Sequence, residues 1–141
     1  MVSGHISSVA KLEEQVNSGN ERVLTFSVAE EWSKYILHKG YVALDGASIT
    51  VSGVEPKQHK FSVSLIPETI ARTTLGSISK GEFVNLEIDS QTQAIVETVE
   101  RVMAERYVKR SLKEIKFLPA LINKMEKSPK FSLRRHRSGQ Q

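Results

Sequence analysis

The sequence predicts a mainly β fold, a small antiparallel barrel followed by a C-terminal helix. Short runs between residues 23 and 89 alternate apolar and polar side chains, which is the period of half-buried strands. Turn signals separate these runs at regular spacing, as in barrels rather than in βαβ folds. Beyond residue 89 the apolar period changes to about 3.6 residues, which indicates a helix. A chain of 141 residues suits one such domain with an appendage.

The first predicted strand covers residues 23–28, where Leu24, Phe26 and Val28 share one face. The following segment, AEEWSKYIL over residues 29–37, is predicted as a short helix. Gly40 is expected to end this helix with a positive φ, because glycine adopts that conformation at little cost.

Asp45 and Gly46 predict a hairpin between strands near 41–44 and 48–54, since Asp-Gly between alternating runs favours a tight β-turn. In the second of these strands Ser48, Thr50 and Ser52 alternate with Ile49 and Val51. The apolar set is expected to face the core, which leaves the hydroxyls outside or at the barrel mouth, where they could bind a polar ligand. Ordinary solvent exposure of these hydroxyls is the competing interpretation.

Two more strands are predicted, at residues 60–66 before Pro67 and at residues 82–89. Between them, residues 67–76 indicate a brief helical turn. The apolar face of the two strands is expected to comprise Phe61, Val63, Leu65, Val84, Leu86 and Ile88. In the second strand Asn85, Glu87 and Asp89 are expected on the opposite face.

Ser90 and Gln93 are spaced as a capping box for a helix over residues 91–108. One stripe of this helix is apolar: Ile95, Val96, Val99, Val102 and Met103. A small barrel has little outer surface to cover such a stripe, so a partner subunit is the expected receiver, with packing on its own barrel as the alternative. The predicted domains are therefore a barrel over 1–89, an oligomerisation helix over 90–108 and a basic, partly disordered tail over 109–141. Within that tail, residues 116–125 form a plausible short helix.

Charge is distributed unevenly: residues 1–100 carry 8 Lys/Arg against 13 Asp/Glu, and residues 101–141 carry 12 against 3. The basic character therefore belongs to the tail and does not indicate that the barrel binds nucleic acid or membranes. The absence of cysteine excludes disulfides and thiolate chemistry. The opening residues lack an apolar segment of signal-peptide type, and no apolar run could span a bilayer, so a cytoplasmic protein is expected.

Several site classes find no support in the sequence. The histidines His5, His38, His59 and His136 show no ligand spacing, so no metal is expected. The GxSxG elbow of hydrolases and the glycine-rich phosphate loops of nucleotide-binding proteins do not occur.

Three ordered segments carry a resemblance to a known family: KGYVALDGASITVSGV, FSVSLIPETIARTTL and KGEFVNLEIDSQTQAIVETVERV. They resemble the C-terminal barrel of the riboflavin synthases, over residues 3 to 104, and the opening SGHI is similar to the start of that barrel. The resemblance implies a six-stranded antiparallel Greek-key barrel of the lumazine-binding type. It also implies the family reaction, in which a four-carbon unit passes between two molecules of 6,7-dimethyl-8-ribityllumazine to give riboflavin, with no metal or redox cofactor.

The resemblance also implies positions for the site. The substrate-binding positions are Lys39, Ser48, Thr50, Ser64, Ile66 and Thr69. Ser48, Asp45 and Asp89 are the candidates for activating a nucleophile or moving protons, and His5 falls at the barrel mouth. Purely structural roles compete for two of them, since Asp45 could simply form the hairpin turn and Asp89 could simply precede the helix.

In one respect the chain departs from the family, whose members carry two homologous barrels with the active site between barrels of different subunits. Only the second barrel is recognisable here, so the expected partners are lumazine and riboflavin together with either a homo-oligomer, a trimer in the family, or a separate first-barrel chain. A non-catalytic flavin or lumazine carrier is the alternative function. Recruitment of RNA or an anionic surface by the basic tail is a further, weaker hypothesis.

Overall fold

The computed structural model describes residues 4–127. The chain divides into two compact units, one ending at Thr98 and the other beginning at Val99. The first unit contains all six strands and the first turns of the last helix, and the second contains the rest of that helix.

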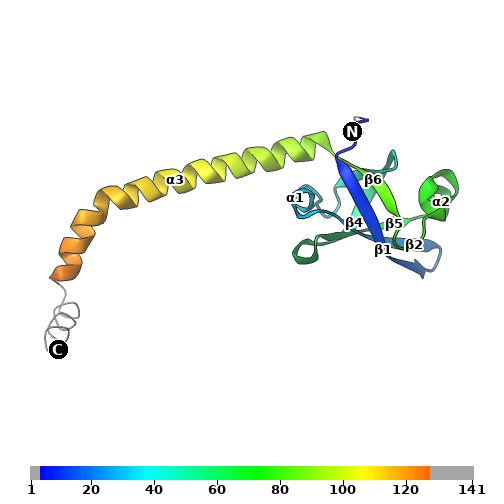
Figure 1. Ribbon diagram of the computed structural model, residues 1–141, viewed down its shortest axis with the longest axis horizontal. Helices are drawn as coiled ribbons and strands as arrows, with labels where there is room; N and C mark the ends of the chain where they lie inside the picture. Colours follow the sequence, from blue (N-terminus) through cyan, green and yellow to red (C-terminus); the bar gives the residue numbers. More distant parts are fainter. Residues whose placement is uncertain (1–3, 128–141) are drawn as a thin grey trace, which may run out of the picture. The chain divides into compact units, whose positions relative to one another are not determined.

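Six antiparallel strands close a barrel in the order β1-β2-β5-β4-β3-β6 (Figure 1). The strands span Ser8–Ser18 (β1), Glu21–Ser27 (β2), Tyr41–Leu44 (β3), Ala47–Glu55 (β4), Lys60–Leu65 (β5) and Phe83–Ile88 (β6). Short helical segments connect them: α1 (Glu30–Ser33), η1 (Pro56–Gln58), α2 (Pro67–Arg72) and η2 (Thr74–Ser77). The long helix α3 (Ser90–Glu126) follows β6. The predicted six-stranded antiparallel barrel with a C-terminal helix is thus confirmed.

The barrel interior is filled by the apolar residues that alternate along each strand. Buried there are Ala10, Leu12, Leu24, Phe26, Val42, Leu44, Ile49, Val51, Phe61, Val63, Leu65, Val84, Leu86 and Ile88. Phe26 and Phe61 are register partners on β2 and β5, and their rings stack with centroids 5.5 Å apart. Such an aromatic pair adds about 1 kcal/mol to the gain from burial alone.

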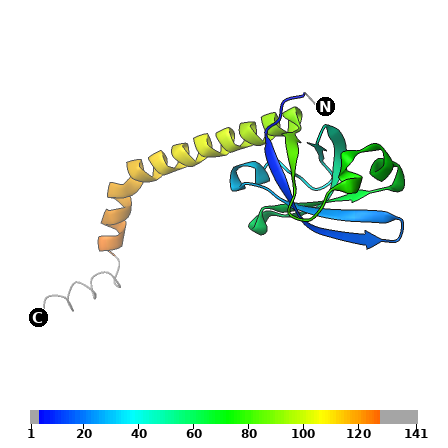
Figure 2. The same cartoon turned by 45° about the vertical axis from the view of Figure 1, so that its right-hand side comes forward.

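β1 closes the barrel, and it is the strand that the sequence patterns do not predict. It pairs with β2 on one side and with β6 on the other, as the long β1–β2 hairpin in Figure 2 illustrates. Only Ala10 and Leu12 of this strand are buried, and its register shifts between Leu12 and Glu14. The shift interrupts the period of two, and the charged residues beyond it hide the strand from a search for alternation.

The predicted helix over 29–37 is mostly wrong, because α1 is a single turn ending at Ser33. The positive φ falls on Lys39 (67°) rather than on Gly40. Lys39 N donates to Val51 O and Gly40 O accepts from Val51 N, so both residues are tied to β4. A Cβ at Gly40 would lie 3.0 Å from Leu37 O, a tight contact that favours glycine there.

α3 differs from the prediction at both ends. Its cap is Asp89, whose carboxylate accepts hydrogen bonds from Thr92 N and Thr92 Oγ1, each at 2.9 Å, so the predicted capping box of Ser90 and Gln93 is one residue out of place. The helix continues past residue 108 to Glu126, through residues expected to form a tail. Residues 128–141 of that tail, including His136, lie outside the described residues.

The apolar stripe at the start of α3 is only partly covered. Val96 packs against the barrel core. In contrast, Ile95, Val99, Val102 and Met103 are exposed. Within the first unit, packing of the helix on its own barrel therefore accounts for Val96 but not for Ile95.

Candidate functional site

The hydroxyls of β4 lie on the outer surface of the barrel, as predicted from the strand phase. Ser48, Thr50 and Ser52 are exposed, whereas Ile49 and Val51 between them are buried. Ser52 Oγ donates to Ser62 O at 3.0 Å, so it is engaged locally. Ser48 and Thr50 lie in the part of β4 that pairs with β3.

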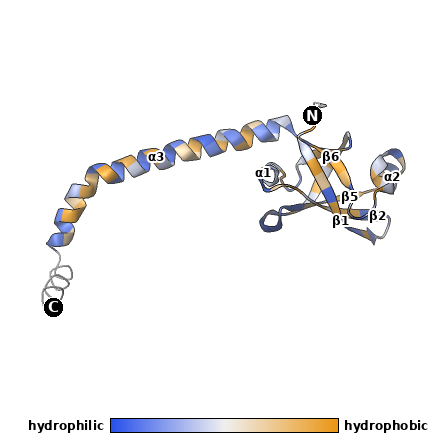
Figure 3. Ribbon diagram, viewed as in Figure 1, coloured by the Kyte–Doolittle hydropathy of each residue, from blue (hydrophilic) through white to orange (hydrophobic). Residues whose placement is uncertain are grey.

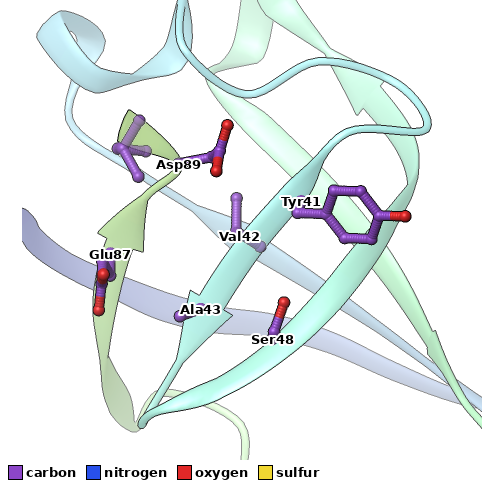
Figure 4. Close-up of a pocket in the computed structure, with 7 residues that line it drawn as sticks. Tyr41, Val42, Ala43, Ser48, Glu87 and Asp89 are labelled. Carbon is purple, nitrogen blue, oxygen red and sulfur yellow. The ribbon is translucent and has the colours of Figure 1, made fainter. Parts of the chain in front are cut away.

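Ser48 and Asp89 both line a small hollow (Figure 4). Its lining is Tyr41, Val42, Ala43, Ser48, Glu87, Ile88 and Asp89, from β3, β4 and the end of β6. Ser48 pairs in register with Ala43, and Ala43 pairs with Glu87, so these residues form one row across three strands. The central member of that row is alanine, whose small side chain lies between the two polar ones.

Glu87 is a site residue that the sequence pattern does not reveal. The pattern places it on the exposed face of β6, but only 7% of it is exposed, and it is the buried charged residue within the described part of the chain. The chain before β1 covers it, and Gly4 N donates to Glu87 Oε1 at 3.1 Å. A buried carboxylate needs polar partners of this kind, because desolvation otherwise disfavours its charge. Predicting the burial of Glu87 requires knowing that the residues before β1 lie against β6, which the sequence pattern does not indicate.

Asp89 has two roles in the structure: it lines the hollow, and it caps α3 by accepting a hydrogen bond from Thr92 N. The first backbone N–H groups of a helix have no partner within the helix, and the helix dipole favours negative charge beside them. This environment stabilises the ionised carboxylate at the edge of the hollow.

Asp45 lies in the β3–β4 turn rather than in the hollow. It has φ 48° and precedes Gly46 at φ 82°, as in the tight turn predicted from the sequence. Its carboxylate accepts from Asn85 N at 2.7 Å and from Thr74 Oγ1 at 3.4 Å. The turn is thereby tied to β6 and η2, which supports the structural interpretation of Asp45.

Three of the other predicted binding positions, Thr50, Ser64 and Lys39, lie near the end of the pairing between β4 and β5. In the pairing of β4 with β5, Glu55 lies opposite Lys60 at one end and Val51 lies opposite Val63 at the other. Beyond that second end, the next residue of β4 is Thr50 and the next residue of β5 is Ser64. Lys39 adjoins this end through its bond to Val51 O. Ile66 follows β5 with half of its surface exposed, and Thr69 lies in α2. These residues do not line the hollow, and Ser48 and Thr50 on one face of β4 connect the two regions.

His5 is exposed in the segment that precedes β1. This segment runs alongside β6 in space, because Gly4 N donates to Glu87 Oε1 and Ser7 N donates to Leu86 O at 2.8 Å. The chain therefore carries His5 along the strand that supplies Glu87 to the hollow. In residues 4–127 no group of three or more His, Asp or Glu side chains is placed to hold a metal ion.

The lining of the hollow includes one serine, one tyrosine and two carboxylate side chains. A serine hydroxyl can donate and accept hydrogen bonds, and carboxylates can accept protons from a bound molecule. The neighbouring end of the β4–β5 pairing adds a cation at Lys39 and an apolar side chain at Ile66.

Comparison with known proteins agrees with the fold. The model of the lumazine binding domain family matches residues 3–89. Riboflavin synthase of Escherichia coli (strain K12) is 50% identical over 107 residues, which are 75% of this chain and 49% of that protein. Riboflavin synthase of Chlamydia pneumoniae is 41% identical over 104 residues, 74% of this chain and 49% of that protein. The chain thus spans about half the length of the curated relatives it matches.

Solved structures with the same fold include LumP in complex with 6,7-dimethyl-8-(1'-D-ribityl) lumazine, with a TM-score of 0.58 at 18% identity over 62% of this chain and 49% of that one. LumP in complex with riboflavin gives a TM-score of 0.59 at 18% identity, over 64% of this chain and 48% of that one. At this identity the likeness concerns the barrel fold. No helix within residues 4–127 has the length and apolar character needed to cross a membrane.

Proposed function

The chain belongs to the lumazine binding domain family, and on that premise we propose that its barrel binds 6,7-dimethyl-8-ribityllumazine and takes part in riboflavin synthesis. The observation that carries the proposal is the 50% identity to a riboflavin synthase over 107 residues, 75% of this chain. In that reaction one lumazine donates a four-carbon unit to a second, giving riboflavin and a pyrimidinedione.

We assign ligand binding to Lys39, Ser48, Thr50, Ser64, Ile66 and Thr69. The hydroxyls of Ser48 and Thr50 point from one face of β4, where they can bond the polar edge of a ring system. Ile66 offers an exposed apolar surface, 49% accessible, against which a ring can stack. Ser64 and Thr69 extend the polar surface on the β5 side.

For the chemistry, the shared hollow favours Ser48 and Asp89 among the candidates. The reaction needs a proton removed from the 7-methyl group of one lumazine and a nucleophile activated at C7 of the other. Asp89 lines the hollow with a carboxylate, a group that can accept a proton from a bound molecule. His5 remains a candidate at the edge of the site. Asp45 has its carboxylate engaged in the turn, and we propose that it acts on the site only by fixing the β3–β4 hairpin.

A single barrel of this kind holds half of what the reaction needs. Two lumazines must be brought together, and holding both reactants in one site provides much of the acceleration in such a transfer. We therefore propose that two barrels pair, either from two copies of this chain or from this chain and a separate first-barrel protein. A non-catalytic lumazine or flavin carrier is the second candidate, supported by the shared fold with LumP, which is solved in complex with 6,7-dimethyl-8-(1'-D-ribityl) lumazine and with riboflavin.

The test combines binding and turnover. The purified chain is titrated with 6,7-dimethyl-8-ribityllumazine and with riboflavin while ligand fluorescence is recorded, and riboflavin formation is followed in parallel. Saturable binding with riboflavin formation is the expected result. Binding without turnover, even after addition of a first-barrel protein, assigns the carrier function. Absence of saturable binding up to about millimolar ligand, equivalent to about 4 kcal/mol, contradicts both candidates.

A further inference from the structure

The second unit of the chain, the part of α3 from Val99 onward, carries an apolar stripe beyond the barrel. Six side chains recur at intervals of three and four residues, the spacing of one helix face. They are Val108, Leu112, Ile115, Leu118, Ile122 and Met125, each about half exposed or more. Apolar and hydrophilic colours accordingly alternate along this part of α3 in Figure 3. The lumazine binding domain model ends at residue 89, so this stripe is not part of the matched domain.

A basic stripe runs along the opposite side of the same helix. It comprises Arg106, Lys109, Lys113, Lys116, Lys124 and Lys127. The basic stripe begins at Arg106, two positions before the apolar stripe begins at Val108. Since each residue turns the helix by about 100°, two positions correspond to about 200°, which places the two stripes on roughly opposite faces. Over residues 106–127 there are seven Lys/Arg and two Glu, so the segment is both amphipathic and strongly basic.

A second copy of the helix is a poor occupant for the apolar stripe. A coiled-coil seam through Val108, Ile115 and Ile122 would place Ser111 at a core position and Pro119 beside the seam. Proline within a helix removes one backbone hydrogen bond and bends the helix, which disturbs continuous knobs-into-holes packing. A nucleic acid would engage the cations but leave six apolar side chains in water.

An anionic lipid surface satisfies both stripes at once. A basic amphipathic helix lies in the plane of the interface, with its apolar face at the boundary of the headgroups and its cations attracted to acidic headgroups. We propose that residues 106–127 of α3 form such an interfacial helix and bind the chain to anionic membranes. This proposal is independent of lumazine binding, since it concerns a segment outside the matched domain.

The first experiment measures sedimentation of the full chain with vesicles. Binding is expected to vesicles of mixed phosphatidylcholine and phosphatidylglycerol, to be weak with phosphatidylcholine alone, and to fall as salt is added. Lys109→Gln, Lys113→Gln and Lys116→Gln combined should weaken binding by at least about tenfold. The matched triple change to Arg keeps the charge and should retain binding. No binding to the mixed vesicles, or equal binding to both compositions, overturns the proposal.

The second experiment tests the apolar stripe. Leu118→Gln with Ile122→Gln should reduce binding to the mixed vesicles several-fold without changing the charge. Phe117→Gln is the matched control, because Phe117 is exposed but lies among the cations, and its effect should be smaller. An unchanged affinity in the double variant would mean adsorption by charge alone and would refute the interfacial helix. Loss of oligomeric mass in this variant without lipid would show that a second copy covers the stripe, which also refutes it.

Discussion

Ser48 is the residue where the strand phase, the hollow and the family resemblance coincide. Its hydroxyl is exposed and shares the hollow with Glu87 and Asp89, and its removal leaves no cavity in the core. We expect Ser48→Ala to leave the barrel folded and to lower kcat by more than about tenfold, because a group that stabilises the transition state contributes several kcal/mol. Affinity for lumazine should weaken less, by about 1 kcal/mol for one neutral hydrogen bond.

The control for this variant is Ser52→Ala, which removes a hydroxyl from the same face of β4 outside the hollow. Steady-state kinetics of both variants, in an assay made competent by a partner barrel if necessary, separate the roles. If kcat at saturation is unchanged in Ser48→Ala and only KM rises, Ser48 belongs to ligand binding and leaves the catalytic candidates.

At Asp45 the structure favours the turn over the chemistry. Asp45→Ala loses the acceptor for Asn85 N and places alanine at a positive φ, so unfolding should become easier by about 1–3 kcal/mol. Asp45→Asn should be milder, since asparagine tolerates that φ and keeps an acceptor. Denaturant unfolding measures both, and kcat of the folded Asp45→Asn protein should equal that of the wild type. A large loss of kcat in this stable variant would restore Asp45 as a catalytic residue.

For single residues, the sequence predicts well which face of a strand a side chain occupies, and it predicts poorly which other residues surround that side chain. Ser48 on the outer face and Ile49 in the core follow from alternation alone. The same alternation places Glu87 in solvent, and it is wrong there because burial of Glu87 depends on a segment more than 80 positions away in the chain. The shared hollow of Ser48 and Asp89 likewise depends on three-strand register, which a local pattern does not contain.

At the scale of elements, strands with regular alternation or a strong turn signal are predictable and those with bulges or charged outer segments are not. β3, β4 and β5 follow from the Asp-Gly turn and the period of two, whereas β1 is hidden by its register shift. α1 is short because the residues after it turn to bond β4, an arrangement that overrides the local preference for helix.

The start of α3 is tied to the rest of the barrel unit by a hydrogen bond whose strength depends on pH. Tyr35 donates its hydroxyl proton to Glu97 Oε1 at 2.9 Å. Hydrogen bonds from Gln93 and Tyr35 hold the pKa of Glu97 below its ordinary value. The bond to Glu97, followed by burial, raises the pKa of Tyr35.

The directions of the two pKa shifts predict the pH range in which this hydrogen bond stabilises the fold. A carboxyl with a lowered pKa contributes stability above its unfolded value, near 4.5, and the contribution is lost as pH falls through the folded pKa. A tyrosine with a raised pKa contributes below its unfolded value, near 10, and the contribution is lost as pH rises through the folded pKa. Tyr35→Phe should therefore lower Tm at neutral pH, with the difference from wild type shrinking at low pH. A difference in Tm that is constant from neutral to acid pH would mean that packing, not the bond to Glu97, is what the variant loses.

At the scale of the whole molecule, the sequence predicts the barrel and the helix but not where the helix ends or what its exposed faces contact. The stripe of Ile95, Val99 and Val102 is open on the described surface, unlike Val96. We expect Val99→Glu to lower the oligomeric mass in sedimentation, because a charge on that stripe opposes its burial against a second copy. Ala104→Glu adds the same charge on the other side of the helix from this stripe and is the matched control. A wild-type chain that stays monomeric at high concentration would end this prediction.

If the barrel binds one lumazine and takes part in the transfer, as proposed, catalysis should depend on the same association, because the transfer brings two lumazines together. If two copies form the site, riboflavin formation per chain rises with protein concentration until pairing is complete, whereas lumazine binding per chain stays constant. Val99→Glu should shift the rise in activity to higher concentration and leave lumazine affinity unchanged, because Val99 lies outside the binding positions. If a separate first-barrel protein completes the site, the chain is inactive alone at every concentration and gains activity in proportion to the added partner. Activity per chain that is independent of concentration, measured where sedimentation finds only monomer, would mean that a single barrel carries out the transfer and would refute the requirement for pairing.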